Sequence, residues 1–290
     1  MTYSRPETTT RDYYNDQSAD RFYYSVWGGE DIHIGIYRYP SESIFAASRR
    51  TVETMCAFLP RLNASTRVLD IGAGYGGSAR YLAMQFQCEV TCLNLSDVQN
   101  QKNRQQTEEA GLDSLIEVVD GSFENIPFSP NSFEVVWSQD AILHSDDRKK
   151  VLEEVHRVLK PGGVFIFTDP MQSDECPKEA LAPVLARIHL ESLGSPGVYR
   201  QIAAQLGWIE LKFEDLSSQL PIHYRRVLEE ITGRETEIVR QCTPEYIERM
   251  KTGLGHWIKN GEKGYLKWGI FLFQKPDVFQ DSFVGSRPVQ

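Results

Sequence analysis

Residues 68–77 read Val-Leu-Asp-Ile-Gly-Ala-Gly-Tyr-Gly-Gly. Three β-prone residues and one acid lead into a turn with four glycines, and a helix-like segment, 78–86, follows at once. Because glycine has no Cβ, such a turn lets a ligand approach the backbone closely and accommodates positive φ angles. A strand, a glycine-rich turn and a helix are typical of nucleoside-cofactor sites above the carboxyl ends of parallel strands. A tight turn without a ligand is the competing interpretation.

The segments around this turn alternate between strand and helix patterns. The second helix starts with the capping box Ser96-Asp-Val-Gln99, and the third stops at Lys160-Pro-Gly-Gly163. This rhythm predicts an α/β fold of the Rossmann-like kind, a mostly parallel sheet with helices on both faces. We predict strands at 67–71, 88–93, 115–119, 133–138 and 163–168, and helices at 76–86, 97–110 and 146–160.

The flanking regions define the predicted domain organisation. We expect residues 1–60, with a helix at 41–59, to form an N-terminal helical lid. Residues 61–275 form the cofactor-binding domain, and a helical cap insertion occupies about 218–262, between a strand at 208–216 and a final strand at 265–274. Residues 276–290 form a tail.

Aromatic residues are dense before the glycine turn. Their rings either pack on the core or cover a site, where they exclude water and present π faces to a cation. Eight of them fall between residues 13 and 39: Tyr13, Tyr14, Phe22, Tyr23, Tyr24, Trp27, Tyr37 and Tyr39.

Composition and charge exclude several classes of function. The 290 residues include 31 basic and 40 acidic side chains, and the net charge of −9 argues against nucleic acid or an anionic membrane as the main partner. No apolar run approaches the ~20 residues that span a bilayer, and residues 1–20 lack the apolar core of a signal peptide, so we expect a cytoplasmic protein. Five cysteines without metal-site spacing and six scattered histidines predict reduced thiols and no metal site.

Two polar residues end neighbouring predicted strands. Asn94 stands about twenty positions beyond the glycine turn, where nucleoside-binding folds use an acid to hold the ribose diol. Asparagine offers one acceptor oxygen where a carboxylate offers two. Asp120, at the end of the third strand, would face the exocyclic amine of an adenine. A strand-end turn at Asn94 and a surface Asp-Gly turn at Asp120 are the structural alternatives.

Five ordered motifs together resemble class I S-adenosylmethionine-dependent methyltransferases: Asp70-Ile-Gly-Ala-Gly74, Asn94, Asp120-Gly121, Ser138-Gln-Asp140 and Leu159-Lys-Pro-Gly-Gly163. The resemblance implies a seven-stranded sheet whose last strand is antiparallel. It also implies S-adenosyl-L-methionine as cofactor, S-adenosyl-L-homocysteine as its product, and a glycine turn that cradles the methionine part. Asn94 departs from the acid that is commoner there. The implied cofactor residues are Asp70, Gly72, Ala73, Gly74, Asn94, Leu95, Gln99, Asp120, Gly121, Ser122 and Gln139.

Flanking motifs narrow the subgroup. The segments 22–29, 33–37 and 93–100 resemble sarcosine/dimethylglycine N-methyltransferases, the enzymes of glycine betaine synthesis, and the similarity runs from about 13 to 275. The phosphoethanolamine N-methyltransferases are a second relative, because Asp140-Ala-Ile-Leu-His144 matches their pattern. Their catalytic Tyr–His dyad would be Tyr23 and His144 here. A phosphobase or prenyl-ring substrate, a non-enzymatic binding module and a homo-oligomer are left open.

The chemistry of the implied reaction suggests roles for further residues. A protonated amine has no lone pair, and exposing the free amine of a group with a pKa of ~10 at pH 7 costs about 4 kcal/mol. His144 is suited to take up or relay that proton. The structural alternative is a histidine of the core or the surface without a catalytic role. Arginines could clamp the substrate carboxylate, and aromatic faces could stabilise the quaternary ammonium product. The predicted substrate-binding residues are Tyr24, Trp27, Tyr37, Arg38, Asp140, Tyr199 and Arg200.

Overall fold

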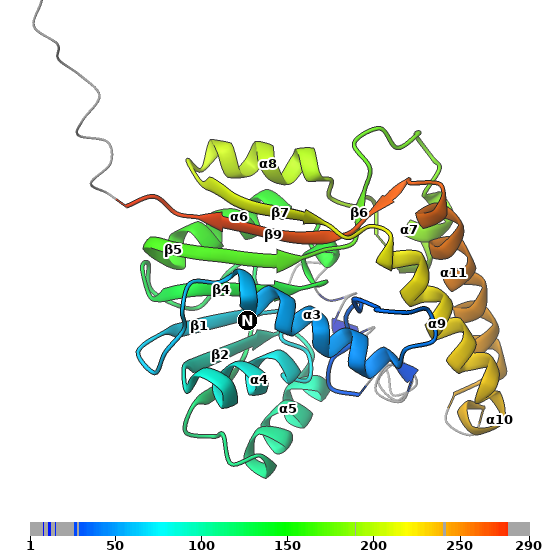
Figure 1. Ribbon diagram of the computed structural model, residues 1–290, viewed down its shortest axis with the longest axis horizontal. Coiled ribbons are helices and arrows are strands. Elements are labelled where there is room, and N and C mark those ends of the chain that lie inside the picture. Colours follow the sequence, from blue (N-terminus) through cyan, green and yellow to red (C-terminus); the bar gives the residue numbers. More distant parts are fainter. Residues whose placement is uncertain are drawn as a thin grey trace, which may run out of the picture.

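The computed structural model describes residues 8, 11, 12, 15, 26, 27, 29–188, 190–239 and 242–277. Tyr23 and Tyr24, with most of the aromatic segment before residue 26, therefore lie outside the described residues. The described chain forms a central sheet flanked by helices, with a further helical layer at one end of the strands (Figure 1).

The central sheet has seven strands in the order β3-β2-β1-β4-β5-β9-β7. The first five are parallel, whereas β9 runs antiparallel to both of its neighbours. The fold class and the antiparallel last strand predicted from the motifs are thus confirmed. The strands are β1 (Arg67–Ile71), β2 (Glu89–Asn94), β3 (Ile116–Asp120), β4 (Phe133–Gln139), β5 (Leu159–Thr168), β7 (Ile209–Asp215) and β9 (Gly269–Gln274).

Continuous apolar runs give the central strands side chains that are buried on both faces of the sheet, because successive side chains of a strand point to opposite sides. On one face the rings of Phe165, Phe167 and Phe271 stack in a row, with centroids 4.7 and 5.3 Å apart. This face packs on α6 (Arg148–Val158) and α8 (Pro196–Gln205).

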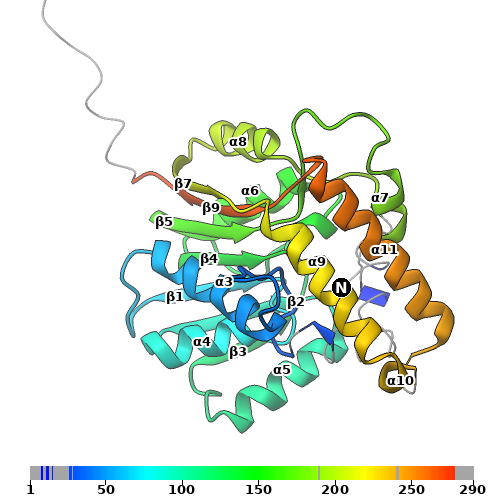
Figure 2. The same ribbon diagram turned by 45° about the vertical axis from the view of Figure 1, so that its right-hand side comes forward.

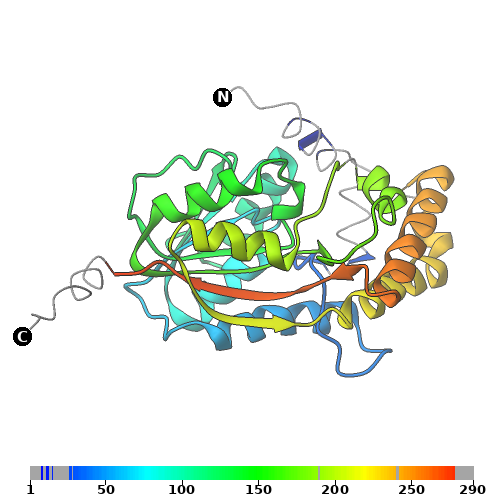
Figure 3. The same cartoon turned by 90° about the horizontal axis from the view of Figure 1, so that it is seen from above.

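The opposite face of the sheet packs on α3 (Ile44–Phe58) and α4 (Gly77–Phe86). The view from above shows α6 and α8 on one side of the strands and α3 on the other (Figure 3). The helix α5 (Asp97–Glu109) contacts β3 and begins at Ser96, whose Oγ accepts from the Gln99 amide as the capping box predicts.

The start of the fifth strand differs from the sequence prediction by four residues. Strand β5 begins at Leu159, directly after α6, and not at residue 163. Leu159 pairs with Phe133 and Val164 with Val135, so the segment between them bulges and lets the strand start early. The residues predicted to stop the helix therefore belong to the strand.

The predicted cap consists of helices at the carboxyl ends of the parallel strands. Helices α9 (Gln219–Gly233) and α11 (Pro244–Glu262) pack side by side, with α7 (Ala182–Ile188) against α11 and the short α10 (Glu235–Ile238) after α9 (Figure 2). Thr243 begins α11, because its Oγ1 accepts from the Tyr246 amide. The helical content expected at 218–262 is confirmed, whereas the division into lid, domain, cap and tail stays a prediction.

A second, two-stranded sheet was not predicted. It pairs β6 (Met171–Gln172) with β8 (Leu266–Lys267) beside the cap. Two-residue strands carry no periodic pattern that a sequence reading could detect. Among the described residues, no helix has both the length and the apolar character to cross a membrane.

Candidate functional site

The glycine turn after β1 is fixed against the end of β2. Gly72 and Gly74 have φ angles of 77° and 53°, in the left-handed region that favours glycine. The Gly72 and Ala73 amides donate to the Leu93 carbonyl at 2.8 and 3.3 Å. A Cβ on Gly72 would lie 2.3 Å from that of Ala141. Only glycine fits this close approach, and the turn therefore presents bare backbone to the space above the sheet.

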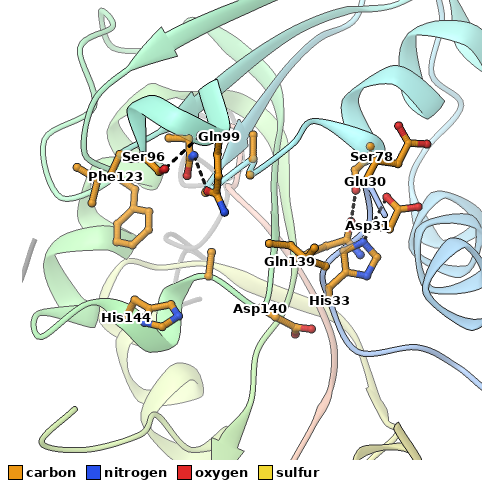
Figure 4. A pocket seen from close by; sticks show the side chains of 18 of the residues that line it. Glu30, Asp31, His33, Ser78, Ser96, Gln99, Phe123, Gln139, Asp140 and His144 are labelled. Carbon is orange, nitrogen blue, oxygen red and sulfur yellow. Dashed lines mark hydrogen bonds and ion pairs between the residues drawn. The ribbon is translucent and has the colours of Figure 1, made fainter. Parts of the chain in front are cut away.

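A pocket opens beside this turn. It contains about 950 Å³ of space free of protein atoms, the open solvent at its mouth included, which is within the range of small-molecule sites. Its walls come from the ends of β1, β2 and β4, the turns after them and residues 30–33 (Figure 4). His144 and Asp140, predicted from the sequence, line it. So do eight of the predicted cofactor residues: Gly72, Ala73, Gly74, Asn94, Leu95, Gln99, Gly121 and Gln139.

Three predicted cofactor residues stand outside the described lining: Asp70, Asp120 and Ser122. Asp70 is buried in β1, where burial, followed by the charge of Asp31, raises the pKa of its carboxyl to about 7. The carboxylate of Asp120 accepts from Asn100 Nδ2 at 2.7 Å and from Arg104 Nη2 at 2.6 Å. Asp120 thus joins the end of β3 to α5, and direct contacts from the three residues to a cofactor stay a prediction.

The polar side chains of the lining offer both acceptors and donors. Asn94 Nδ2 donates to Gln99 Oε1 at 3.0 Å, so the Asn94 oxygen can accept a bond from a ligand. On the facing wall, Gln139 Oε1 accepts from Trp137 Nε1 at 3.0 Å and from the Ser78 hydroxyl. The Gln139 amide nitrogen is buried and has no hydrogen-bond partner within the part of the chain that the structure describes. The pocket is thus built for a polar ligand.

Asp140 joins three distant parts of the chain at the edge of the pocket. It follows β4 with a φ of 50°, an uncommon conformation for a residue with a side chain. Its carboxylate accepts from the Ile34 amide at 2.7 Å and from Trp268 Nε1 at 2.8 Å. Burial raises the pKa of this carboxyl. The predicted substrate-binding residue therefore also holds the wall of the pocket in place.

His144 ends the short 3₁₀ turn η1 (Ile142–His144) and lines the pocket. The turn is held because the Leu143 amide donates to Asp169 Oδ1 at 2.9 Å, while Arg148 donates to the Leu143 carbonyl at 3.3 Å. Burial, with a second contribution from the Arg148 charge, lowers the pKa of His144 to about 4. The imidazole is therefore neutral at pH 7.

Two predicted aromatic residues lie behind the pocket, and not in its described lining. Trp27 and Tyr37 are buried, with exposed fractions of 5% and 6%. The Tyr37 hydroxyl lies 2.9 Å from His223 Nδ1, and the Trp27 ring packs on His223 with centroids 5.5 Å apart. Both residues attach the segment before α3 to the cap helix α9.

The structure does not bring the predicted carboxylate clamp into the described lining of the pocket. Arg200 Nε and Nη2 donate to Glu210 at 2.8 and 2.9 Å, and its guanidinium lies over the Phe213 ring. Tyr199 is fully buried and donates to Asp169 Oδ2 at 2.6 Å. Both residues are on α8, which packs on one face of the sheet and not over the strand ends. Arg38 is exposed and also lies outside the described lining of the pocket.

The sequence reading assigned no role to the segment that completes the pocket wall. His33 Nε2 lies 3.6 Å from Asp31 Oδ1, and Asp31 contacts Arg49 Nη2 at 2.8 Å. Glu30 forms ion pairs with Arg49 and Arg80 at 2.7 and 2.6 Å. The available signal was the cluster Glu30, Asp31 and His33 just after two glycines. A loop, however, has no periodicity that shows which side chains point inward.

Comparisons with known proteins agree with this geometry. A family model described as a methyltransferase domain matches residues 69–167, from β1 to β5. The sarcosine/dimethylglycine N-methyltransferase of Aphanothece halophytica is 56% identical over 266 residues, which cover 92% of this chain and 96% of that protein.

Solved structures are similar over nearly the same length. A candidate sarcosine dimethylglycine methyltransferase from Galdieria sulphuraria has 45% identity and a TM-score of 0.87, with 91% of this chain and 99% of that chain covered. Phosphoethanolamine N-methyltransferase 2 from Haemonchus contortus, solved with phosphomonomethylethanolamine and S-adenosylhomocysteine, has 20% identity and a TM-score of 0.81, with 95% and 61% covered. The second likeness is one of fold.

Proposed function

Because the chain belongs to the sarcosine/dimethylglycine N-methyltransferase family, we propose that it methylates the amine of sarcosine and dimethylglycine toward glycine betaine. The family predicted from the sequence motifs is confirmed, and the chain is a methyltransferase. The observation that carries the proposal is the 56% identity to a sarcosine/dimethylglycine enzyme over almost the whole of both chains. S-adenosyl-L-methionine is the methyl donor.

The pocket has the features that this donor needs. At Gly74 an added Cβ would meet only Ile32, 3.8 Å away, so the turn leaves room for a ligand against its backbone. We assign the methionine part to residues 72–74, a ribose hydroxyl to Asn94 and Gln99, and the unpartnered nitrogen of Gln139 to an acceptor on the ligand. When bound, the donor supplies a sulfonium methyl that a nitrogen lone pair can take.

The protein must present the amine with that lone pair free. Asp140 and His144 line the pocket and are the groups that we assign to the amine. Because the pKa of His144 is about 4, its ring is neutral at pH 7. It can then accept a hydrogen bond or relay a proton, but it does not stay protonated. The predicted partner of His144, Tyr23, lies outside the described residues, and the dyad stays a prediction.

Orientation supplies the remaining catalysis. In-line transfer requires the amine to face the donated methyl at about 3 Å, and fixed geometry of this kind contributes most of the rate. Asp140 is suited to fix it, because two hydrogen bonds hold its carboxylate on the pocket wall. The pocket therefore orients the amine by a rigid strand end and not by a free loop.

Methyl transfer to defined amines tests the proposal. The full chain is incubated with methyl-labelled S-adenosylmethionine and, in separate reactions, with glycine, sarcosine, dimethylglycine and phosphoethanolamine. We expect label in dimethylglycine from sarcosine and in betaine from dimethylglycine. Absence of label with all three amino acids, or a larger kcat/KM for phosphoethanolamine, would contradict it.

A further inference from the structure

The pocket wall made by residues 30–33 and Asp140 carries three of the four acidic residues in the described lining of the pocket. Glu30, Asp31 and Asp140 line it together with His33. Burial opposes ionisation of Asp31, but His33, Arg49 and other cations hold the pKa of its carboxyl below the usual value. An ammonium ion that enters the pocket is attracted to this wall, because opposite charges interact strongly away from bulk water.

His33 lines the pocket and has buried ring nitrogens without hydrogen-bond partners among the described residues. Its side chain is buried, with 7% of the residue exposed, and its ring lies beside Asp31 in the pocket wall (Figure 4). Neither Nδ1 nor Nε2 has a hydrogen-bond partner among the described residues. Nε2 faces the Asp31 carboxylate at 3.6 Å. Since buried polar atoms are nearly always hydrogen-bonded, the open ring nitrogen points to a contact with the substrate.

We propose that His33, oriented by Asp31, accepts the proton that the substrate's ammonium must lose before methyl transfer, an inference that rests on the proposed function. The N–H bond of the ammonium breaks, its electron pair stays on the amine nitrogen as the lone pair, and the proton forms a new bond to Nδ1. Nε2–H faces Asp31, whose carboxylate stabilises the imidazolium. The imidazolium returns the proton to water after the product leaves.

The charges around His33 favour this role. The two arginines in the surroundings are engaged by carboxylates, Arg49 by Glu30 and Asp31 and Arg80 by Glu30. His223 on α9 is neutral, because burial, then His33, lowers its pKa to about 3. Asp31, Asp140 and His223 interact electrostatically with His33, while Glu30, Arg49 and Arg80 are the charged groups around Asp31.

His144 cannot take the same role. It lines the same pocket, but burial, and then the charge of Arg148, disfavour a positive charge on its ring and lower its pKa. The two imidazoles lie on different sides of the pocket (Figure 4). A proton placed next to Asp31 is compensated, whereas one placed next to Arg148 is not. His33 holds the proton, and His144 serves as a neutral acceptor.

The variant His33→Gln tests this inference in the full chain. Glutamine keeps hydrogen-bonding capacity but cannot hold a proton at pH 7. We expect kcat/KM for dimethylglycine to fall about 100-fold or more at pH 7. It should return to within about 10-fold of the wild type near pH 10, where the amine itself is free. Affinity for S-adenosylhomocysteine, measured by calorimetry, should change less than about threefold if His33 acts on the amine and not on the cofactor.

Two further variants separate a proton acceptor from a structural residue. Asp31→Asn should lower kcat/KM at pH 7 by about 10-fold in the wild-type background. The same change should have a much smaller effect when His33→Gln is already present, because both residues then act in the same proton transfer and their effects do not add. His256→Gln changes a histidine on α11 outside the described lining of the pocket and should leave the pH profile unchanged.

The outcomes distinguish this inference from the proposed function. An active wild type with an equally active His33→Gln variant at pH 7 overturns the inference alone. A loss that is constant from pH 7 to 10, or a parallel loss of S-adenosylhomocysteine binding, overturns it as well, since His33 would then be a structural or cofactor-binding residue. A wild type that methylates none of the three amino acids defeats the proposed function and this inference with it.

Discussion

The two histidines that line the pocket lie in opposite electrostatic surroundings. His33 faces the Asp31 carboxylate at 3.6 Å, whereas His144 stands beside the Arg148 guanidinium. The same side chain is thereby assigned two tasks, since a neighbouring anion stabilises a bound proton and a neighbouring cation excludes it. The comparison indicates that burial and the sign of the nearby charges together decide which of the two rings can hold a proton.

The largest effect should come from removing charge on the carboxylate side. Asp140→Asn keeps a side chain that tolerates the φ of 50° but loses the carboxylate that accepts two hydrogen bonds. A hydrogen bond between charged groups is worth roughly 1.5–3 kcal/mol, so loss of the bond to the substrate ammonium should lower kcat/KM for dimethylglycine about 10- to 150-fold. Steady-state kinetics and a thermal melt of each protein measure the effect. A loss below about 10-fold would remove Asp140 from the amine site.

A smaller effect is expected on the side of Arg148. His144→Gln should lower kcat about 10-fold, because a neutral hydrogen-bond acceptor is only partly replaced, and S-adenosylhomocysteine affinity should change less than about threefold. The pKa of His144, lowered to about 4, keeps the ring neutral from pH 8 to 5. The ratio of variant to wild-type activity should therefore be constant over that range. A ratio that changes near pH 6.5 would show that His144 titrates and would erase the contrast with His33.

The same contrast predicts how stability depends on pH. The unfolded chain protonates His144 near ~6.5 but the folded chain only near 4, so the unfolded state binds more protons between these values. The contribution of His144 to the free energy of unfolding is fully present above about pH 6.5 and is lost as the pH falls from there through 4. Urea unfolding at pH 7 and 4.5 should show a smaller loss for His144→Gln than for the wild type. Both proteins should still lose some stability at pH 4.5, because the pKa of His223 is also lowered, to about 3. An equal loss in both would contradict the lowered pKa.

The smallest effect is expected away from both histidines. Arg200→Gln removes an ion pair with Glu210 on the surface of the sheet, where such pairs contribute little. We expect KM for sarcosine and dimethylglycine to change less than about threefold. A tenfold rise in KM with unchanged stability would restore Arg200 as a carboxylate clamp and would place substrate contacts beyond the pocket described above.

Much of the fold could be predicted because its signals are periodic. The strands between 67 and 168 could be predicted because their side chains are buried on both faces of the sheet, as at Phe165 and Ile166. The turn at 72–74 was predictable from glycine alone, since no other residue fits beside Ala141. The ends of parallel strands meet at one edge, so Asn94 and Gln139 could be assigned to one site before their contacts were known.

The remaining parts of the site depend on tertiary contacts. Nothing in the order of residues 30–33 shows that Asp31 contacts Arg49 of α3 and directs His33 into the pocket. Arg200 illustrates the opposite case, since this arginine of a suggestive motif lies on α8 and pairs with Glu210 outside the described lining of the pocket. The apolar side chains of α8 show which of its faces is buried, but which part of the molecule the helix covers depends on tertiary packing.

The position of β9 constrains the order in which a ribosome can complete this molecule. β9 lies between β5 and β7, and Trp268, just before it, donates to Asp140 on the pocket wall. A nascent chain that has exposed β1 to β5 thus has a sheet with an open edge and a pocket wall without one of its supports. Because binding stabilises only a site that has formed, the cofactor cannot assist folding fully until residues 268–274 have left the ribosome. The site can become functional only after these residues, and not merely the glycine turn, have emerged from the ribosome.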